Sequence, residues 1–339
     1  MHFKTKYPFI LSLVSILFYF SSVKAEIKVV TSIKPIHSLV SYIMDGVGSP
    51  DLIVDGYNSP HGFNLKPSHA KMLQEADIVI YVGEGVEEFL EKPLESIASN
   101  AVKFELLGQS GIKKLKFRER NIFGDHDDHD DHGHDKKAKK EDHDDHDDHD
   151  HDKKAKKDDH DDHGHDDHGH GHGEFDPHIW LDPMNAKIIV KKVTNQLSKL
   201  DKENSSIYKS NSKKALKELD QMIKEVKSDV NKDAKVVVFH DAYQYFEKRF
   251  KVNIIGALTV NTDVLPGAEQ LSEIREVIEH EKVTCVLSEP QFNPDIVETI
   301  AKDTNISSGV LDPLGATLDS GKTLYFDLIK NISLSIKNC

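Results

Sequence analysis

The stretch IKVVTSIKPIHSLVSYIM, residues 27–44, sets the pattern that the rest of the chain repeats. Residues 27–31 form a short apolar run rich in β-branched side chains, which is typical of a buried strand. From residue 35 to residue 44 the apolar side chains follow helical spacing instead. A buried strand followed directly by a helix predicts the first βα unit of an α/β fold.

The same alternation of strand and helix continues to about residue 107 and restarts near residue 236. Further strands are predicted at residues 52–54, 78–82, 102–107, 236–239, 252–256, 283–288 and 309–311. Helices are predicted to begin at Pro67 and Pro183 and to cover residues 86–99, 242–249, 266–281, 294–303 and 322–337. Short, continuously apolar strands between amphipathic helices predict mostly parallel sheets covered on both faces.

A long amphipathic helix is predicted from about residue 205 to 230, because apolar side chains recur there at three- and four-residue spacing. At 1.5 Å per residue this helix would be roughly 40 Å long. We therefore predict two similar α/β lobes joined by one rigid helix. The predicted divisions are an N-terminal lobe over residues 26–203, a linking helix over 204–231 and a C-terminal lobe over 232–339.

Residues 1–25 have the features of an export signal: two early lysines, an apolar run and a small-residue cleavage site ending at Ala25. A membrane anchor is the alternative, but the run is short for a spanning helix, which needs about 20 apolar residues. We therefore expect release into an oxidising compartment such as a bacterial periplasm. That compartment suits Cys285 and Cys339, either as a disulfide that ties the last element to the C-terminal half or as two unpaired thiols.

Residues 125–172 form an insertion that consists almost wholly of His, Asp, Lys and Gly, with 14 of the 21 histidines, 20 acidic residues and 8 lysines. With so few apolar side chains to bury, we expect it to be disordered. Dense imidazole suits zinc, copper, iron or nickel, whereas a solvating acidic linker is the alternative. The candidate auxiliary metal ligands are His126, His129, His132, His134, His143, His146, His149, His151, His160, His163, His165, His168, His170 and His172.

The net charge of −14 comes mostly from this insertion, which contributes −12. The signal region contributes +3, so that the remaining chain carries only −5. No basic face is evident in that remainder, which argues against nucleic acid as a partner. The sequence also lacks the complete phosphate-binding motif G-x-x-x-x-G-K-[ST], an HExxH helix and a nucleophile elbow.

Outside the insertion, His61, His178, His240 and Asp312 stand in turn-rich settings or directly after predicted strands. Ligands in open α/β sheets bind beyond the carboxyl ends of the strands, so these four residues are candidates for a site. Their spacing alone is a weak argument for a metal, because they are far apart in sequence. Ordinary polar loop histidines are the alternative.

Several segments together resemble one known family. They are Thr31-Ser32-Ile33-Lys34-Pro35, Pro60-His61, Lys66-Pro67-Ser68, Tyr81-Val82-Gly83, Asp176-Pro177-His178-Ile179-Trp180-Leu181-Asp182-Pro183, Phe239-His240-Asp241-Ala242-Tyr243, Ser288-Glu289-Pro290-Gln291-Phe292 and Leu311-Asp312-Pro313-Leu314-Gly315. In this order they resemble the zinc-specific solute-binding proteins of bacterial ABC importers, the ZnuA type. The likeness covers essentially the whole chain after residue 25, and an acidic His-rich loop is typical of the zinc branch.

The resemblance implies two Rossmann-like lobes with one zinc ion in the cleft between them, bound by His61, His178 and His240. A water or a carboxylate would supply the fourth ligand, with Asp312 as a candidate. Some zinc-binding members carry Glu where this chain has Pro60, so that carboxylate is absent. Manganese-binding relatives carry Glu in place of His240, and a third imidazole favours zinc. The cysteine pair matches a disulfide of the zinc branch.

The function implied by the resemblance is capture of periplasmic zinc and its delivery to the membrane permease of an ABC importer. The His-rich insertion would act as an auxiliary zinc collector or sensor. Such a protein is a binding protein, not an enzyme, and is expected to be monomeric. The alternatives are manganese or iron uptake, a periplasmic zinc buffer and, from another class, a zinc hydrolase with three histidines and a water.

Overall fold

The computed structural model describes residues 26–83, 85–118, 120–123, 174–260, 262 and 266–339. The predicted export signal and the His-rich insertion, with its fourteen candidate ligands, lie outside the described residues. In the described part of the chain, no helix combines the length and the apolar composition needed to cross a membrane.

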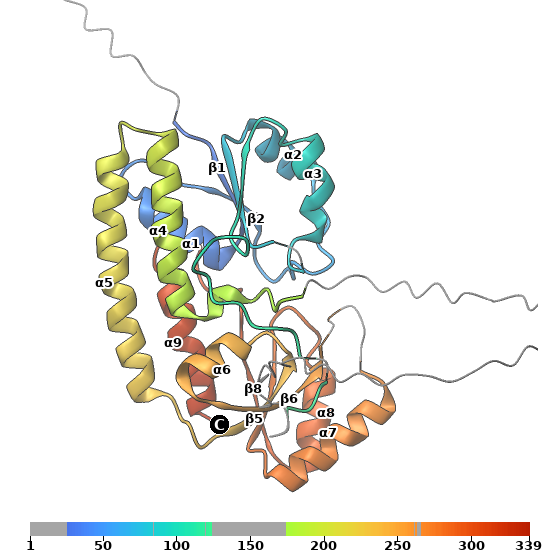
Figure 1. The fold of residues 1–339 in the computed structure, drawn as a ribbon. Coiled ribbons are helices and arrows are strands. Elements are labelled where there is room, and N and C mark those ends of the chain that lie inside the picture. The colour runs from blue at the N-terminus through green and yellow to red at the C-terminus, as the bar shows by residue number, and fades with distance from the viewer. Residues whose placement is uncertain (1–25, 84, 119, 124–173, 261, 263–265) are drawn as a thin grey trace, which may run out of the picture.

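Two four-stranded parallel sheets form the centres of two lobes (Figure 1). The first sheet has the order β2-β1-β3-β4 and consists of β1 (Val29–Ile33), β2 (Asp51–Val54), β3 (Ile78–Tyr81) and β4 (Val102–Glu105). The second has the order β6-β5-β7-β8 and consists of β5 (Lys235–His240), β6 (Asn253–Thr259), β7 (Cys285–Ser288) and β8 (Ser307–Val310). The predicted pair of parallel α/β lobes is therefore confirmed.

Both sheets repeat one topology, in which the second strand of the lobe lies on one side of the first and the third strand lies on the other. The chain therefore adds strands first on one side of β1 and then on the other side, and it does the same around β5. Loops that leave the carboxyl ends of strands at such a reversal diverge and open a crevice. Residues just after β5 and β7 are thus placed at the crevice of the second lobe.

Helices cover both sheets (Figure 1). In the first lobe they are α1 (Lys34–Met44), α2 (Pro67–Glu75), α3 (Glu91–Ser96) and α4 (Pro183–Leu200), with 3₁₀ turns η1 (Glu88–Leu90) and η2 (Ile179–Leu181). In the second they are α6 (Gln244–Phe250), α7 (Ala268–Glu281) and α8 (Asp295–Thr304). The helix predicted over residues 86–99 is much shorter than expected, because Pro93 fits only in the first turn of an α-helix.

The long predicted helix is α5 (Ser205–Asp229), whose 25 residues extend about 37 Å at 1.5 Å per residue. It packs against α4 and α1 of the first lobe and leads into β5 of the second (Figure 1). The hydroxyl of Tyr42 on α1 donates a hydrogen bond of 2.6 Å to Glu218 on α5. This helix therefore runs along the first lobe and leads the chain into the second (Figure 1).

A second helix also joins the lobes. The final helix, α9 (Leu324–Lys337), packs against α1 and α5 although it follows the second sheet in sequence. Its Tyr325 hydroxyl donates to the carbonyl oxygen of Trp180 at 2.6 Å. A disulfide between Cys285 and Cys339 fastens the end of the chain to β7. The predicted disulfide is confirmed, and the alternative of two unpaired thiols is wrong.

The segment after β4 makes a further link that the sequence analysis did not anticipate. It crosses to the second lobe, where Ile122 pairs with Gly256 in an antiparallel bridge on β6. The amide of Ala257 donates to the carbonyl oxygen of Asn121 at 2.8 Å. A Cβ atom on Gly256 would lie 2.7 Å from that same oxygen, so the close approach requires glycine.

Candidate metal centre

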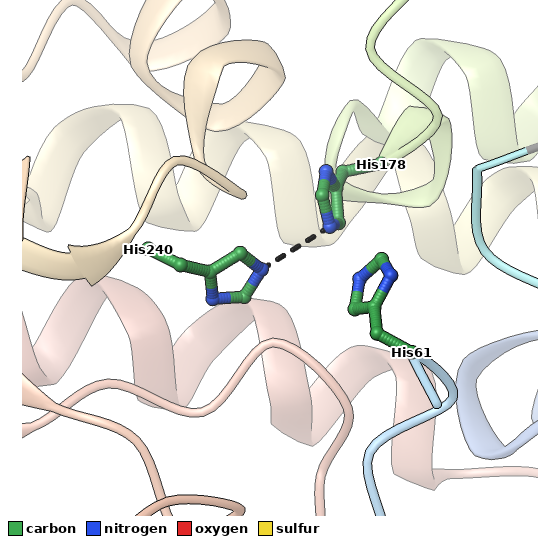
Figure 2. A group of neighbouring side chains, drawn as sticks. All are labelled: His61, His178 and His240. Carbon is green, nitrogen blue, oxygen red and sulfur yellow. Dashed lines mark hydrogen bonds between the residues drawn. The ribbon is translucent and has the colours of Figure 1, made fainter. Parts of the chain in front are cut away.

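Three histidines from separate parts of the chain meet between the lobes (Figure 2). His61 lies in the loop between β2 and α2, His178 directly precedes η2, and His240 is the last residue of β5. One ring nitrogen of each lies within 4.8 Å of those of the other two. The structure thus brings together the three histidines that the sequence analysis selected.

Backbone geometry accounts for the position of His61. The next residue, Gly62, has a φ of 69°, a left-handed conformation that glycine adopts without steric cost. The hydroxyl of Ser59 accepts a hydrogen bond of 3.2 Å from the His61 amide. The loop therefore turns sharply at His61 and directs its half-buried ring toward the other two imidazoles (Figure 2).

The ring of His178 is oriented by a carboxylate two residues earlier. Asp176 Oδ1 accepts hydrogen bonds from both the backbone amide and Nδ1 of His178, at 2.9 and 2.8 Å. An ionised carboxylate oxygen only accepts hydrogen bonds, so with Asp176 ionised the Nδ1 atom carries the hydrogen in the second bond. The Tyr245 hydroxyl on α6 donates to the Asp176 carbonyl at 2.7 Å, which ties the segment to the second lobe.

His240 is oriented in the same way by Glu289, which follows β7. Glu289 Oε1 accepts from Nδ1 of His240 at 2.6 Å and from the His240 amide at 3.4 Å. The two residues meet because β5 and β7 are neighbours at the chain reversal of the second sheet. The sequence analysis did not assign a role to Glu289 or Asp176; the post-strand position of Glu289 was the signal that could have identified it.

These contacts leave the Nε2 atoms of His178 and His240 facing each other at 3.3 Å. With hydrogen on each Nδ1, neutral rings present lone pairs at both Nε2 atoms. Once both rings are neutral, a cation between them would be bound by the two Nε2 lone pairs, and a carboxylate on the opposite ring nitrogen strengthens an imidazole ligand. The arrangement therefore matches a metal centre with oriented histidines.

Burial and charge act differently on the two buried histidines. Burial, together with the nearby His240, holds the pKa of His178 well below its ordinary value. Burial also disfavours charge on His240, but the charge and hydrogen bond of Glu289, together with the charges of Asp241 and Asp176, outweigh it, so the pKa of His240 is raised. His178 is therefore already neutral at mild acidity, whereas His240 must lose a proton before it can bind a metal.

The space beside the imidazoles suits an ion. A cavity of about 40 Å³ is lined by the three histidines together with Asp241, Phe117 and Pro177 among others. A single water molecule needs at least ~10–15 Å³ of such volume, so this cavity accommodates an ion with one or two waters.

Asp312, the candidate fourth ligand, is not part of the three-histidine group. Its Oδ1 accepts from the amides of Leu314 and Gly315 at 3.0 and 2.9 Å, and its Oδ2 accepts from Ala316 at 2.6 Å. Oδ1 also accepts from the side-chain amide of Gln291 at 3.1 Å. Both carboxylate oxygens are thus used to shape the loop that follows β8.

The raised pKa of His240 predicts how metal affinity depends on pH. Below that pKa a metal ion must displace one proton, so affinity should fall about tenfold per pH unit, and above it affinity should level off. In Glu289→Gln the pKa of His240 drops, and the fall-off should move to lower pH. The lost carboxylate should also weaken affinity at neutral pH by about 10- to 100-fold.

Chelator competition with zinc at a series of pH values measures both effects. Glu281→Gln, which changes an exposed carboxylate beside His280, is the matched control. Identical pH profiles for Glu289→Gln and the control would contradict the role assigned to Glu289.

The family model described as zinc-uptake complex component A, periplasmic (ZnuA), matches residues 29–339. The high-affinity zinc uptake system protein ZnuA of Brucella abortus strain 2308 is 43% identical over 313 residues, 92% of this chain and 91% of that protein. The protein of the same name from Haemophilus influenzae is 36% identical over 318 residues, 93% of each chain. A crystal structure of ZnuA shares the fold, with a TM-score of 0.70 and 21% identity over 93% of this chain and 99% of that one. The chain therefore belongs to the ZnuA family.

Proposed function

We propose that this protein captures zinc in the periplasm and delivers it to the membrane permease of an ABC importer. His61, His178 and His240 are the proposed ligands. The observation that carries the proposal is the convergence of three imidazoles from both lobes, two of them locked by buried carboxylates at Nδ1. The named relatives, described as high-affinity zinc uptake proteins, support the same cargo.

The donor set supports zinc as the cargo. Zinc prefers four-coordinate sites with nitrogen or sulfur ligands, and three imidazoles with one further ligand satisfy that preference. Manganese favours carboxylate and other oxygen ligands, which are absent from the group of three. Neutral imidazoles also leave the bound ion its full charge, so binding can be tight and still reversible.

The division of ligands between the lobes supports release to a partner. His61 and His178 belong to elements of the first lobe, and His240 belongs to the sheet of the second. A displacement of one lobe by a permease would separate the ligands and lower the affinity for the ion. We place the lobes at residues 26–203 and 232–339, with the linking helix at 204–231.

The remaining assignments follow from this function. We infer a monomeric binding protein with no catalytic turnover and no nucleic-acid partner, released to the periplasm after cleavage near Ala25. The small size of the cavity supports capture of an ion over hydrolysis of an organic substrate. The role of residues 125–172 as an auxiliary zinc collector or sensor stays a prediction.

A zinc titration against a competing chelator tests the proposal, on mature protein from which residues 125–172 are deleted. One tight equivalent of zinc is expected to remain, and excess manganese should not displace it. Only weak, multiple binding that disappears with the deletion would favour a zinc buffer and contradict the proposal. Displacement by manganese would favour manganese uptake, and turnover of an ester by the zinc-loaded protein would favour a hydrolase.

A further inference from the structure

Gln291 lies in the loop after β7, two residues beyond Glu289. It lines a second small cavity together with the imidazoles of His61, His178 and His240. This cavity is largely apolar, since its other lining residues include Trp180, Phe292, Pro313 and Leu314. Gln291 therefore places a neutral polar side chain beside the three imidazoles, in a lining that also includes Glu289 and Ser59.

The orientation of the Gln291 amide is determined by Asp312. Gln291 Nε2 donates to Asp312 Oδ1 at 3.1 Å, and that oxygen also accepts two backbone amides. A carboxylate oxygen accepts hydrogen bonds and repels another oxygen, so the NH₂ group of Gln291 must face Asp312. The amide oxygen is therefore directed away from Asp312.

That amide oxygen, Gln291 Oε1, is buried and has no hydrogen-bond partner among the described residues. Burying a carbonyl-type oxygen without a donor is unfavourable, and such atoms in native proteins usually mark a bound water, an ion or a functional group. Beside the imidazoles, a water bound to the metal would supply the missing hydrogen-bond donor.

Two carboxylate oxygens near the site, Asp176 Oδ2 and Glu289 Oε2, also have no hydrogen-bond partner among the described residues. Each belongs to a group that binds Nδ1 of a histidine, on the side of the ring opposite Nε2. These two carboxylates are therefore engaged in orienting the imidazoles. Gln291 Oε1 is a buried acceptor, unpaired among the described residues, whose side chain is held by Asp312.

We propose that Gln291 Oε1 accepts a hydrogen bond from a water that fills the fourth coordination position of the bound ion, an inference that rests on the proposed function. Asp312 then acts on the ion indirectly, by orienting Gln291. A neutral acceptor holds the water without adding charge to the centre. The ion thus keeps a water ligand that dissociates easily. No additional carboxylate ligand is introduced, so the site does not become favourable for manganese, which prefers oxygen ligands.

The test compares Gln291→Leu and Gln291→Glu with the wild-type protein, all lacking residues 125–172. Zinc affinity is measured by chelator competition, and the visible absorption of cobalt(II)-substituted protein reports the ligands of the ion. We expect Gln291→Leu to bind one equivalent about 10- to 100-fold more weakly, with a changed cobalt spectrum. Gln291→Glu keeps an oxygen near the ion but replaces the NH₂ group that faces Asp312 with a charged oxygen, so it too should change the cobalt spectrum.

Gln221→Leu, on the exposed face of α5, is the matched control and should leave both readouts unchanged. Wild-type affinity and an unchanged spectrum in Gln291→Leu would overturn the inference while leaving zinc capture intact. If Gln291→Leu does not fold, an unchanged spectrum in Gln291→Glu overturns it. Absence of tight binding in the wild-type protein would instead refute the proposed function.

Discussion

Replacing His240 by Ala is expected to abolish tight zinc binding while the protein remains folded. The substitution removes one of the three nitrogen ligands, the His240 Nε2 atom that lies 3.3 Å from Nε2 of His178. Loss of a partner behind a ligand already weakens metal affinity by about 10- to 100-fold, so loss of the ligand itself should exceed about 100-fold. The buried Glu289 carboxylate would then lose its hydrogen bond to the imidazole, which should also lower the free energy of unfolding of the metal-free protein.

Chelator competition on protein lacking residues 125–172 measures this loss without interference from the insertion. His280→Ala is the matched control, because His280 is an exposed histidine at the end of α7. The control should bind one tight equivalent, like the wild type. A tight equivalent in His240→Ala would show that the ion is bound elsewhere, and the three-histidine site would be wrong.

Replacing both Cys285 and Cys339 by Ser is expected to lower the free energy of unfolding by about 4 kcal/mol. The disulfide closes a loop of 54 residues, and releasing it restores conformational freedom mainly to the unfolded chain. The end of α9 would also be freed from β7, although α9 would keep its contacts with α1 and α5. The fold and the zinc site should therefore survive the substitution.

Denaturant unfolding of the metal-free protein, without reductant, measures the difference. Ser228→Ala, a substitution on the exposed surface of α5, controls for differences that arise from preparing a variant protein. Wild-type protein treated with reductant should approach the double variant in stability. A difference below about 1 kcal/mol would contradict the expected contribution of the crosslink.

The succession of strands and helices along the chain could be predicted because it depends on local sequence patterns. Runs such as residues 236–239 and the helical spacing around Leu219 and Val226 depend only on neighbours in sequence. The boundaries were less predictable where one residue overrides the pattern, as Pro93 does by delaying α3. His61, His178 and His240 were selected by their positions and by family likeness, and the fold then brought them together.

Other features depend on contacts between residues far apart in sequence. Asp312 looked like a ligand because it follows a strand, but three backbone amides of its own loop and Gln291 use its oxygens. The packing of α9 against the first lobe likewise depends on the shape of a surface built by α1 and α5.

By itself, the sequence determined the α/β class and the two repeats, because local periodicity carries that information. The three imidazoles and the cysteine pair were predicted with the help of family likeness. Only the tertiary structure decided which groups orient and complete the site. Glu289 meets His240 because β5 and β7 are adjacent, across 49 residues of chain. The direction of the Gln291 amide follows from its contact with Asp312, 21 residues away. Hydrogen bonds over such separations depend on strand order and loop geometry, which no local pattern encodes.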